Sequence, residues 1–216
     1  KPDLHRFRKA LCGYLVAIQK DTFSHLEAIK HSSENDEVIR SAFDFLQNRL
    51  SIELCPRVWA LPTEEKILFV EKILNRPIRV CGVVRNEGEP GGGPFWVKDR
   101  NSAASLQIVE SAQVNSDAVQ QDLWRRSTHF NPVDIVCGVR NFEGKNFSLN
   151  EFVNEHTGFI TKKTWDGVTP VKVLERPGLW NGSMWYWNTV FLEVPAHTFN
   201  PVKTVLDLAR AAHMNE

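Results

Sequence analysis

Apolar residues recur at three- and four-residue steps through the first third of the chain, which is the spacing of an amphipathic helix. The positions of this first run are Leu4, Phe7, Leu11, Tyr14, Leu15, Ile18, Phe23, Leu26 and Ile29. A second such run covers residues 34–50. A third begins at Thr63, which suits a helix N-cap because Glu64 and Glu65 follow in the first turn. The spacing predicts a series of helices that ends before Pro77.

From residue 78 the pattern changes to short apolar runs separated by turn residues, which is typical of strands. We expect strands over residues 79–85, 95–97, 106–110, 171–174 and 189–194, and a further apolar element over residues 134–139. Helices are expected again over residues 116–126 and 202–212. The sequence therefore predicts a mixed α/β fold with an α+β tendency. A small helical subdomain would cover residues 1–76 and a mixed α/β body residues 77–216.

The net charge and the hydropathy of the chain argue against nucleic acid and membranes as partners. Lys plus Arg equals Asp plus Glu, at 26 each, so no overall field attracts nucleic acid or an anionic membrane surface. The longest apolar runs are far shorter than the roughly 20 residues that a membrane span needs. The first residues are polar and contain neither a signal region nor an initiator Met. We expect a piece of a longer cytoplasmic protein, with neither nucleic acid nor membrane as its partner.

The cysteines and histidines give no spacing typical of a metal site. Cys12, Cys55, Cys81 and Cys137 sit among apolar neighbours and form no C-x-x-C pair. Buried free thiols in a reducing cytoplasm are the expectation from this pattern. No H-x-x-x-H or H-E-x-x-H spacing occurs, which argues against a zinc site.

Two segments between the predicted strands contain candidate binding residues, each with a structural alternative. The glycine-rich loop 87–94 lacks the G-K-[ST] of a phosphate loop and joins strand to strand. A hairpin connection or a mobile flap is therefore favoured over a flap that covers a ligand. Asn131 and Asp134 suit sugar hydroxyls or a hard cation, whereas the spacing by itself favours turn formation by Asn131-Pro132.

The C-terminal third adds a candidate cation and a group of aromatic residues. Lys203 falls in the first turn of the predicted last helix, where a phosphate would meet both a cation and free backbone amides. A solvated lysine is the alternative at this position. Four of the seven tryptophans lie within residues 165–187, which suggests a packed region or a surface that stacks on a ligand.

Four segments occur in the order found in UDP-glucose pyrophosphorylases. Residues 193–208 (EVPAHTFNPVKTVLDL) resemble the V-P-R-x-x-F-x-P-V-K-T-x-x-D-L signature of those enzymes, and residues 107–111 (QIVES) resemble their V-V-E-Y-S strand. Residues 81–85 (CGVVR) are similar to the G-V-V strand, and residues 130–135 (FNPVDI) to F-N-x-x-N-I/L. The ordered set is more specific than any single motif.

Nearly the whole chain is also similar to the C-terminal part of a bacterial family of unknown function. That family shows the motifs R-V-C-G-V/M-V, G-E-P-G-G-G-P-F, H-F-N-P-V-D and F-N-P-V-K-T, each of which has a counterpart here. The family itself resembles the UDP-sugar pyrophosphorylase group of GT-A-like nucleotidyltransferases. This resemblance implies the C-terminal half of a GT-A-like mixed sheet, preceded by the small helical subdomain.

The resemblance also implies roles for individual residues in binding a sugar phosphate or a nucleotide sugar. Lys203 stands at the phosphate-binding, catalytic lysine, and Glu110 would accept hydrogen bonds from sugar hydroxyls. Gly82 would let the sugar approach the backbone, and Asn131 and Asp134 belong to the segment that contacts the sugar. These residues are expected to converge on one site.

The nucleotide and Mg²⁺ would be bound elsewhere in such an enzyme. Its N-terminal half holds the nucleotide through a G-G-x-G-T-R loop, which has no counterpart here. That missing half is the expected partner of this chain, Mg²⁺ belongs to the full-length protein, and no cofactor is expected for this part alone. Asp134 replaces an Asn of the pyrophosphorylases and Gln113 replaces a second Glu, so a non-catalytic carbohydrate-binding or interaction module is the alternative function.

Overall fold

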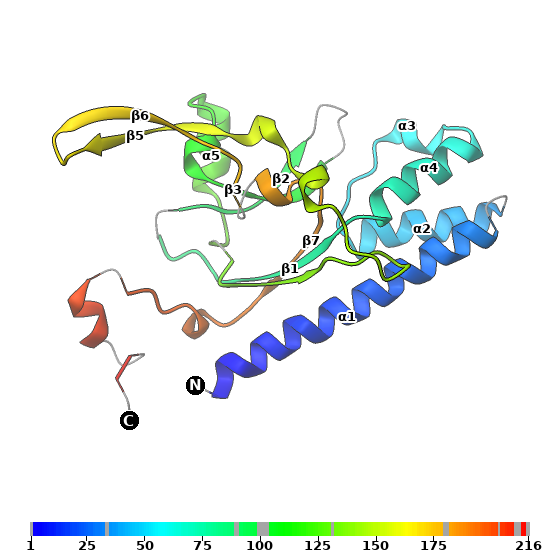
Figure 1. Cartoon of the computed structure of the whole chain (residues 1–216), viewed down its shortest axis with the longest axis horizontal. Helices are drawn as coiled ribbons and strands as arrows, with labels where there is room; N and C mark the ends of the chain where they lie inside the picture. Colours follow the sequence, from blue (N-terminus) through cyan, green and yellow to red (C-terminus); the bar gives the residue numbers. More distant parts are fainter. Residues whose placement is uncertain are drawn as a thin grey trace.

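The chain is described by a computed structural model, which covers residues 2–32, 35–88, 91–98, 104–130, 132–178, 182–202, 204–209 and 213–214. Its helices come first and most of its strands follow, as the change in periodicity predicts (Figure 1). The architecture is α+β, which confirms the predicted fold class. The division at residue 76 into a subdomain and a body stays a prediction.

The N-terminal helices form from the predicted periodic runs. They are α1 (Pro2–His31), α2 (Asp36–Asn48), α3 (Pro56–Trp59) and α4 (Thr63–Leu74). The side chain of Asn35 caps α2 by accepting a hydrogen bond of 2.9 Å from the Glu37 amide. The short helix α3 was not predicted, and it begins at Pro56, a residue that suits the first position of a helix. No helix in the described part of the chain combines the length and hydropathy of a membrane span.

The strands form one three-stranded sheet and two separate two-stranded hairpins. Their bounds are β1 (Ile78–Val83), β2 (Gly93–Lys98), β3 (Ala104–Val109), β4 (Asp134–Gly138), β5 (Phe159–Trp165), β6 (Thr169–Glu175) and β7 (Asn188–Glu193). In the three-stranded sheet the order is β4-β1-β7, with β4 antiparallel and β7 parallel to β1. This central sheet is therefore mixed, as predicted. The hairpins are β2–β3 and β5–β6.

Shorter helical elements join the strands. They are α5 (Ala118–Arg125) and the 3₁₀ turns η1 (Ser111–Gln113), η2 (Leu149–Phe152), η3 (Glu155–Thr157), η4 (Gly182–Met184), η5 (Ala196–Thr198) and η6 (Val205–Ala209). The last predicted helix, over residues 202–212, is in its described part only the turn η6. Residues 203 and 210–212 lie outside the described part of the chain.

The central strand β1 is buried at all six positions because both faces of the sheet are covered. Ile78 and Val80 belong to the main hydrophobic core, which they share with Leu11 of α1 and residues of α2 and α4. On the other face, Arg79 reaches Gln107 of β3. The sheet is thus held between α1 on one side and the β2–β3 hairpin on the other (Figure 1).

Two sequence expectations about connections and thiols are corrected. The loop after β1 leads to β2, which belongs to a different sheet, so it is not a hairpin connection. All four cysteines are free, but only Cys81 is buried, while Cys12 and Cys137 are exposed. Cys12 lies on the solvent side of α1, and Cys137 lies on the edge strand β4.

Candidate functional site

The carboxyl end of the parallel pair β1–β7 brings together two motifs that lie far apart in the sequence. The amide of Phe130 donates to the carbonyl oxygen of Val84 at 2.9 Å, and the amide of Val194 donates to that of Val83 at 2.8 Å. The H-F-N-P-V-D segment therefore flanks one side of the end of β1, and the segment after β7 flanks the other. In open α/β sheets, ligands bind outside the carboxyl ends of parallel strands.

A cluster of three polar side chains lies at this end of the sheet; we call Arg85, His129 and Glu193 the carboxyl-end cluster. Glu193 Oε2 lies 3.0 Å from His129 Nε2 and 3.1 Å from an Arg85 side-chain nitrogen. The second ring nitrogen of His129 lies 2.8 Å from Thr128 Oγ1. The hydrogen bonds from His129 and then from Arg85 hold the pKa of Glu193 below its ordinary value. The cluster thus holds an ionised carboxylate beside an arginine that is still exposed to solvent.

Asp134 begins β4 and pairs in register with Gly82 of β1. Its Oδ1 accepts a hydrogen bond of 2.9 Å from Arg8 Nε, so the ion pair joins β4 to α1. About a quarter of the Asp134 side chain is exposed, at 24%. The carboxylate therefore has oxygen lone pairs left for a ligand, on the side of the sheet that α1 covers.

The space beside Gly82 is filled by protein atoms. A Cβ added there would lie 3.0 Å from Leu11 Cδ1 and 3.4 Å from Val194 Cγ1. The missing side chain thus allows α1 to pack closely on β1. This packing gives no support to the predicted role of Gly82, which was to admit a sugar ring.

Glu110 follows β3 and so belongs to the hairpin on the opposite face of the sheet. Its amide donates to Gln113 Oε1 at 2.9 Å, and Gln113 Nε2 donates to the Thr157 carbonyl at 2.8 Å. Partial burial raises the pKa of Glu110 above its ordinary value. Of the predicted residues the structure brings together Gly82 and Asp134, whereas Glu110 lies over the other face.

The β2–β3 hairpin approaches the carboxyl-end cluster through Gly93. A Cβ at this position would lie 2.8 Å from the His129 carbonyl oxygen and 3.2 Å from Ser127 Oγ. Gly93 pairs in register with Val109, the residue before Glu110. The glycine-rich loop thus ends where the hairpin touches the H-F-N-P-V-D segment, and only a residue without a side chain fits there.

Asn131 and Lys203 lie outside the described residues, so the structure gives no geometry for either. Arg85, His129 and Glu193 were not among the functional residues predicted from the sequence. His129 and Glu193 belong to the motifs already singled out, and the parallel pairing of β7 with β1 is what brings them together. Within the described ranges no three His, Cys, Asp or Glu side chains come close enough to hold a metal ion, so no step is assigned to Mg²⁺.

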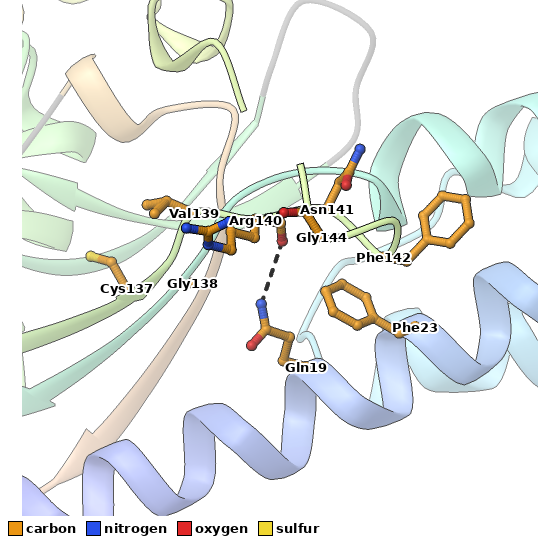
Figure 2. A pocket seen from close by; sticks show the side chains of 9 residues that line it. All are labelled: Gln19, Phe23, Cys137, Gly138, Val139, Arg140, Asn141, Phe142 and Gly144. Atoms are coloured by element: carbon orange, nitrogen blue, oxygen red, sulfur yellow. Dashed lines mark hydrogen bonds between the residues drawn. The ribbon is translucent and has the colours of Figure 1, made fainter. Parts of the chain in front are cut away.

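Two cavities lie away from these residues. One of about 430 Å³ is formed by α1, the far end of β4 and the turn after it (Figure 2). There Gln19 Nε2 lies 3.5 Å from the Arg140 carbonyl oxygen. The other, of about 1050 Å³, lies between β2, α5 and the start of β5. Gly82, Asp134 and the carboxyl-end cluster line neither of them.

We expect Gly93→Ala to lower the free energy of unfolding by about 1–3 kcal/mol, because the new methyl group meets a backbone oxygen that cannot move aside. Gly13→Ala is the matched control: it lies in α1 with nothing within 4 Å of the added Cβ, and it should stabilise the chain by about 0.5–1 kcal/mol. Urea denaturation measures both. Equal effects of the two substitutions would contradict the close contact between hairpin and His129.

The chain is similar to a protein family and to a solved structure. No protein of curated function matches the sequence. A mutant UDP-glucose pyrophosphorylase from Leishmania major, solved in complex with UDP-glucose, is 20% identical with a TM-score of 0.40, which is too low to establish a shared fold. That match covers 68% of this chain and 33% of the other, so the chain spans about a third of the length of that protein. A family model matches residues 1–214, and the chain therefore belongs to the family described as Domain of unknown function (DUF4301).

Proposed function

We propose that this chain is the sugar-phosphate-binding portion of a nucleotidyltransferase that resembles the sugar-nucleotide pyrophosphorylases. In that reaction an oxygen of the sugar 1-phosphate forms a bond to the α-phosphorus of a nucleoside triphosphate. The bond between the α-phosphorus and the bridging oxygen breaks, and pyrophosphate leaves. Such chemistry depends mainly on positioning and on neutralising the phosphate charge.

One observation carries the proposal: two of the four ordered motifs flank the carboxyl end of β1. The segment that leads from β7 towards Lys203 is packed against the H-F-N-P-V-D segment, since the rings of Phe199 and Phe130 lie 5.2 Å apart. His197 in the same segment lies 6.0 Å from the ring of Phe7 in α1. These contacts hold the segment around Phe199 beside the end of the sheet, where Arg85 supplies a cation.

The proposed division of roles follows from the charges. Lys203, with Arg85, would neutralise the phosphate, and Asn131 and Asp134 would pair with sugar hydroxyls. Catalysis would require the nucleotide-binding half that the pyrophosphorylases have, and with it Mg²⁺. A chain without that half is expected to bind the sugar phosphate and not to convert it.

The partly buried carboxylate of Glu110 further supports the proposal that the chain binds a sugar phosphate. It is half-buried, and no cation pairs with it in the described part of the chain, so its ionised form is disfavoured by desolvation. An ionised side chain whose burial lowers the stability of the folded protein is typical of functional sites. Glu110 would therefore accept hydrogen bonds from a ligand that extends past the end of the sheet to the hairpin face, where Val109 pairs with Gly93 beside His129.

We expect Glu110→Gln to raise the free energy of unfolding at pH 7. Burial raises the pKa of this carboxyl in the folded chain. The free-energy cost of burying the ionised carboxylate is therefore complete at pH values above the pKa of Glu110 in the folded chain. This cost vanishes at pH values below the pKa in the unfolded chain, near 4.5. Urea denaturation at pH 7 and pH 4 should show a gain only at pH 7, while the same variant binds glucose 1-phosphate more weakly. Glu27→Gln, at an exposed position of α1, is the control; a gain at both pH values, or unchanged binding, would contradict the assignment.

Lys203→Ala should weaken the binding of glucose 1-phosphate by about 10- to 150-fold, which corresponds to the loss of one charge-assisted hydrogen bond, about 1.5–3 kcal/mol. The free energy of unfolding should change by less than about 0.5 kcal/mol. Lys203→Arg should restore affinity only in part, because a planar fork replaces a point charge. Isothermal titration calorimetry measures the affinities and urea denaturation measures the free energy of unfolding. Lys172→Ala on the exposed hairpin β5–β6 is the control.

Two results would count against the proposal. Binding of glucose 1-phosphate that is unaffected by Lys203→Ala would mean that the motif does not hold the phosphate. Release of pyrophosphate by this chain from UTP and glucose 1-phosphate, above that of Lys203→Ala, would mean that the whole active site lies within these residues.

A further inference from the structure

The cleft of about 1050 Å³ has no role in the proposed function. Four consecutive residues of β2, Phe95 to Lys98, line it. Successive side chains of a strand point to opposite faces, so the cleft runs along the edge of β2 that does not pair with β3. Its volume is at the upper end of the range of small-molecule sites, about 300–1,000 Å³. It can accommodate more than one sugar ring.

Aromatic side chains make up much of the cleft wall. They are Phe95, Trp96, Trp124, Phe159 and Trp185. The rings of Phe95 and Trp124 stack on each other with centroids 5.1 Å apart, so each covers one face of the other. Trp96 is 56% exposed, which leaves much of its indole surface open to a ligand. An amphipathic ligand with a flat apolar face, such as a pyranose ring, suits such a surface.

Lys98 and His156 line one part of the cleft, whereas the polar groups near α5 favour a neutral ligand over a phosphate. Asn115, Asp117 and Gln120 line the side formed by η1 and α5. The carboxylate of Asp117 caps α5, accepting from the amides of Val119 at 3.1 Å and Gln120 at 3.0 Å. The helix N-terminus is therefore already neutralised by an anion and would repel a second one. Amide and carboxylate groups together supply the donors and acceptors that hydroxyl groups need.

Hydrogen bonds from two glutamines, of which Gln107 is buried, fix two parts of the wall in place. Gln107 is 1% exposed and donates to the Trp185 carbonyl oxygen at 2.9 Å. Its own carbonyl accepts from the buried guanidinium of Arg79 at 3.3 Å. On another side of the cleft, Gln113 holds the Thr157 carbonyl. Buried polar side chains are costly unless hydrogen-bonded, so these links keep the cleft in one shape before a ligand arrives.

From these features we propose that the cleft binds a neutral saccharide, which stacks on Trp96 and pairs its hydroxyls with Asn115, Asp117 and Gln120. This site goes beyond the proposed function and does not depend on it. It shares no lining residue with the carboxyl-end cluster. The chain would then hold a sugar phosphate at one place and a neutral glycan at another.

The proposal is tested by screening the chain on an array of neutral and of phosphorylated glycans, and by titrating the best neutral glycan with calorimetry. Trp96→Ala should weaken that binding at least about tenfold, a loss of about 1.4 kcal/mol. Trp165→Ala is the matched control: this tryptophan is 71% exposed at the tip of β5 and lies outside the cleft, so binding should not change. Lys203→Ala should also leave it unchanged.

A second variant keeps the test decisive if Trp96→Ala alters the fold, as judged by circular dichroism. Gln120→Ala, at an exposed position of α5, should lower affinity as well. The proposal is overturned if the array shows no neutral glycan bound, if only phosphorylated glycans bind, or if neither substitution weakens binding. Loss of glucose 1-phosphate binding in Lys203→Ala with intact glycan binding would separate the two sites.

Discussion

Burial of β1 on both faces and pairing along both of its edges is the constraint on which the rest of the structure depends. Six consecutive buried residues leave no backbone group of the strand open to water, so each amide and carbonyl needs a partner within the protein. β4 and β7 provide these partners along the strand. Beyond its last residue the same ladders continue into the H-F-N-P-V-D segment and the segment after β7. The position of the carboxyl-end cluster follows from this continuation.

The second consequence of this burial is an arginine inside the protein. Arg79 is 0% exposed, donates to Thr189 Oγ1 at 2.8 Å and to Gln107, and has one terminal nitrogen without a hydrogen-bond partner. Burial raises the pKa of the neighbouring Cys81 to about 12, so that thiol stays neutral and does not serve as a counter-ion. Desolvation of an unpaired guanidinium is costly. Its structural effect is to link β1, β7 and β3 and, through Gln107, to fix the wall of the aromatic cleft.

Periodicity along the chain was sufficient to predict elements whose burial is regular. α4 ends before Pro77 as predicted but begins one residue earlier than predicted, because Pro62 and not Thr63 is its N-cap. β1 was predicted from a continuous apolar run. β5 was missed because most of its residues are exposed, so no buried face marks it in the sequence.

Sequence patterns could not predict which distant segments contact each other. The glycine at position 82 does mark a close approach, but the group that approaches is Leu11 of α1 and not a ligand. The motifs carrying Glu110 and Asp134 also gave no sign that these residues lie over opposite faces of the sheet. That separation depends on which face the β2–β3 hairpin covers, and the buried link between Arg79 and Gln107 determines it.

Native-state amide hydrogen exchange, measured by NMR, tests most directly whether the functional end of the molecule is built on β1. The decisive amides are those of Phe130, Val133 and Val194, which donate to carbonyl oxygens at the end of that strand. If the segments are fixed by β1, these amides exchange with the same free energy as the amides of β1 itself, through global unfolding. Exchange of the three amides at a free energy near zero, while β1 stays protected, would contradict this account.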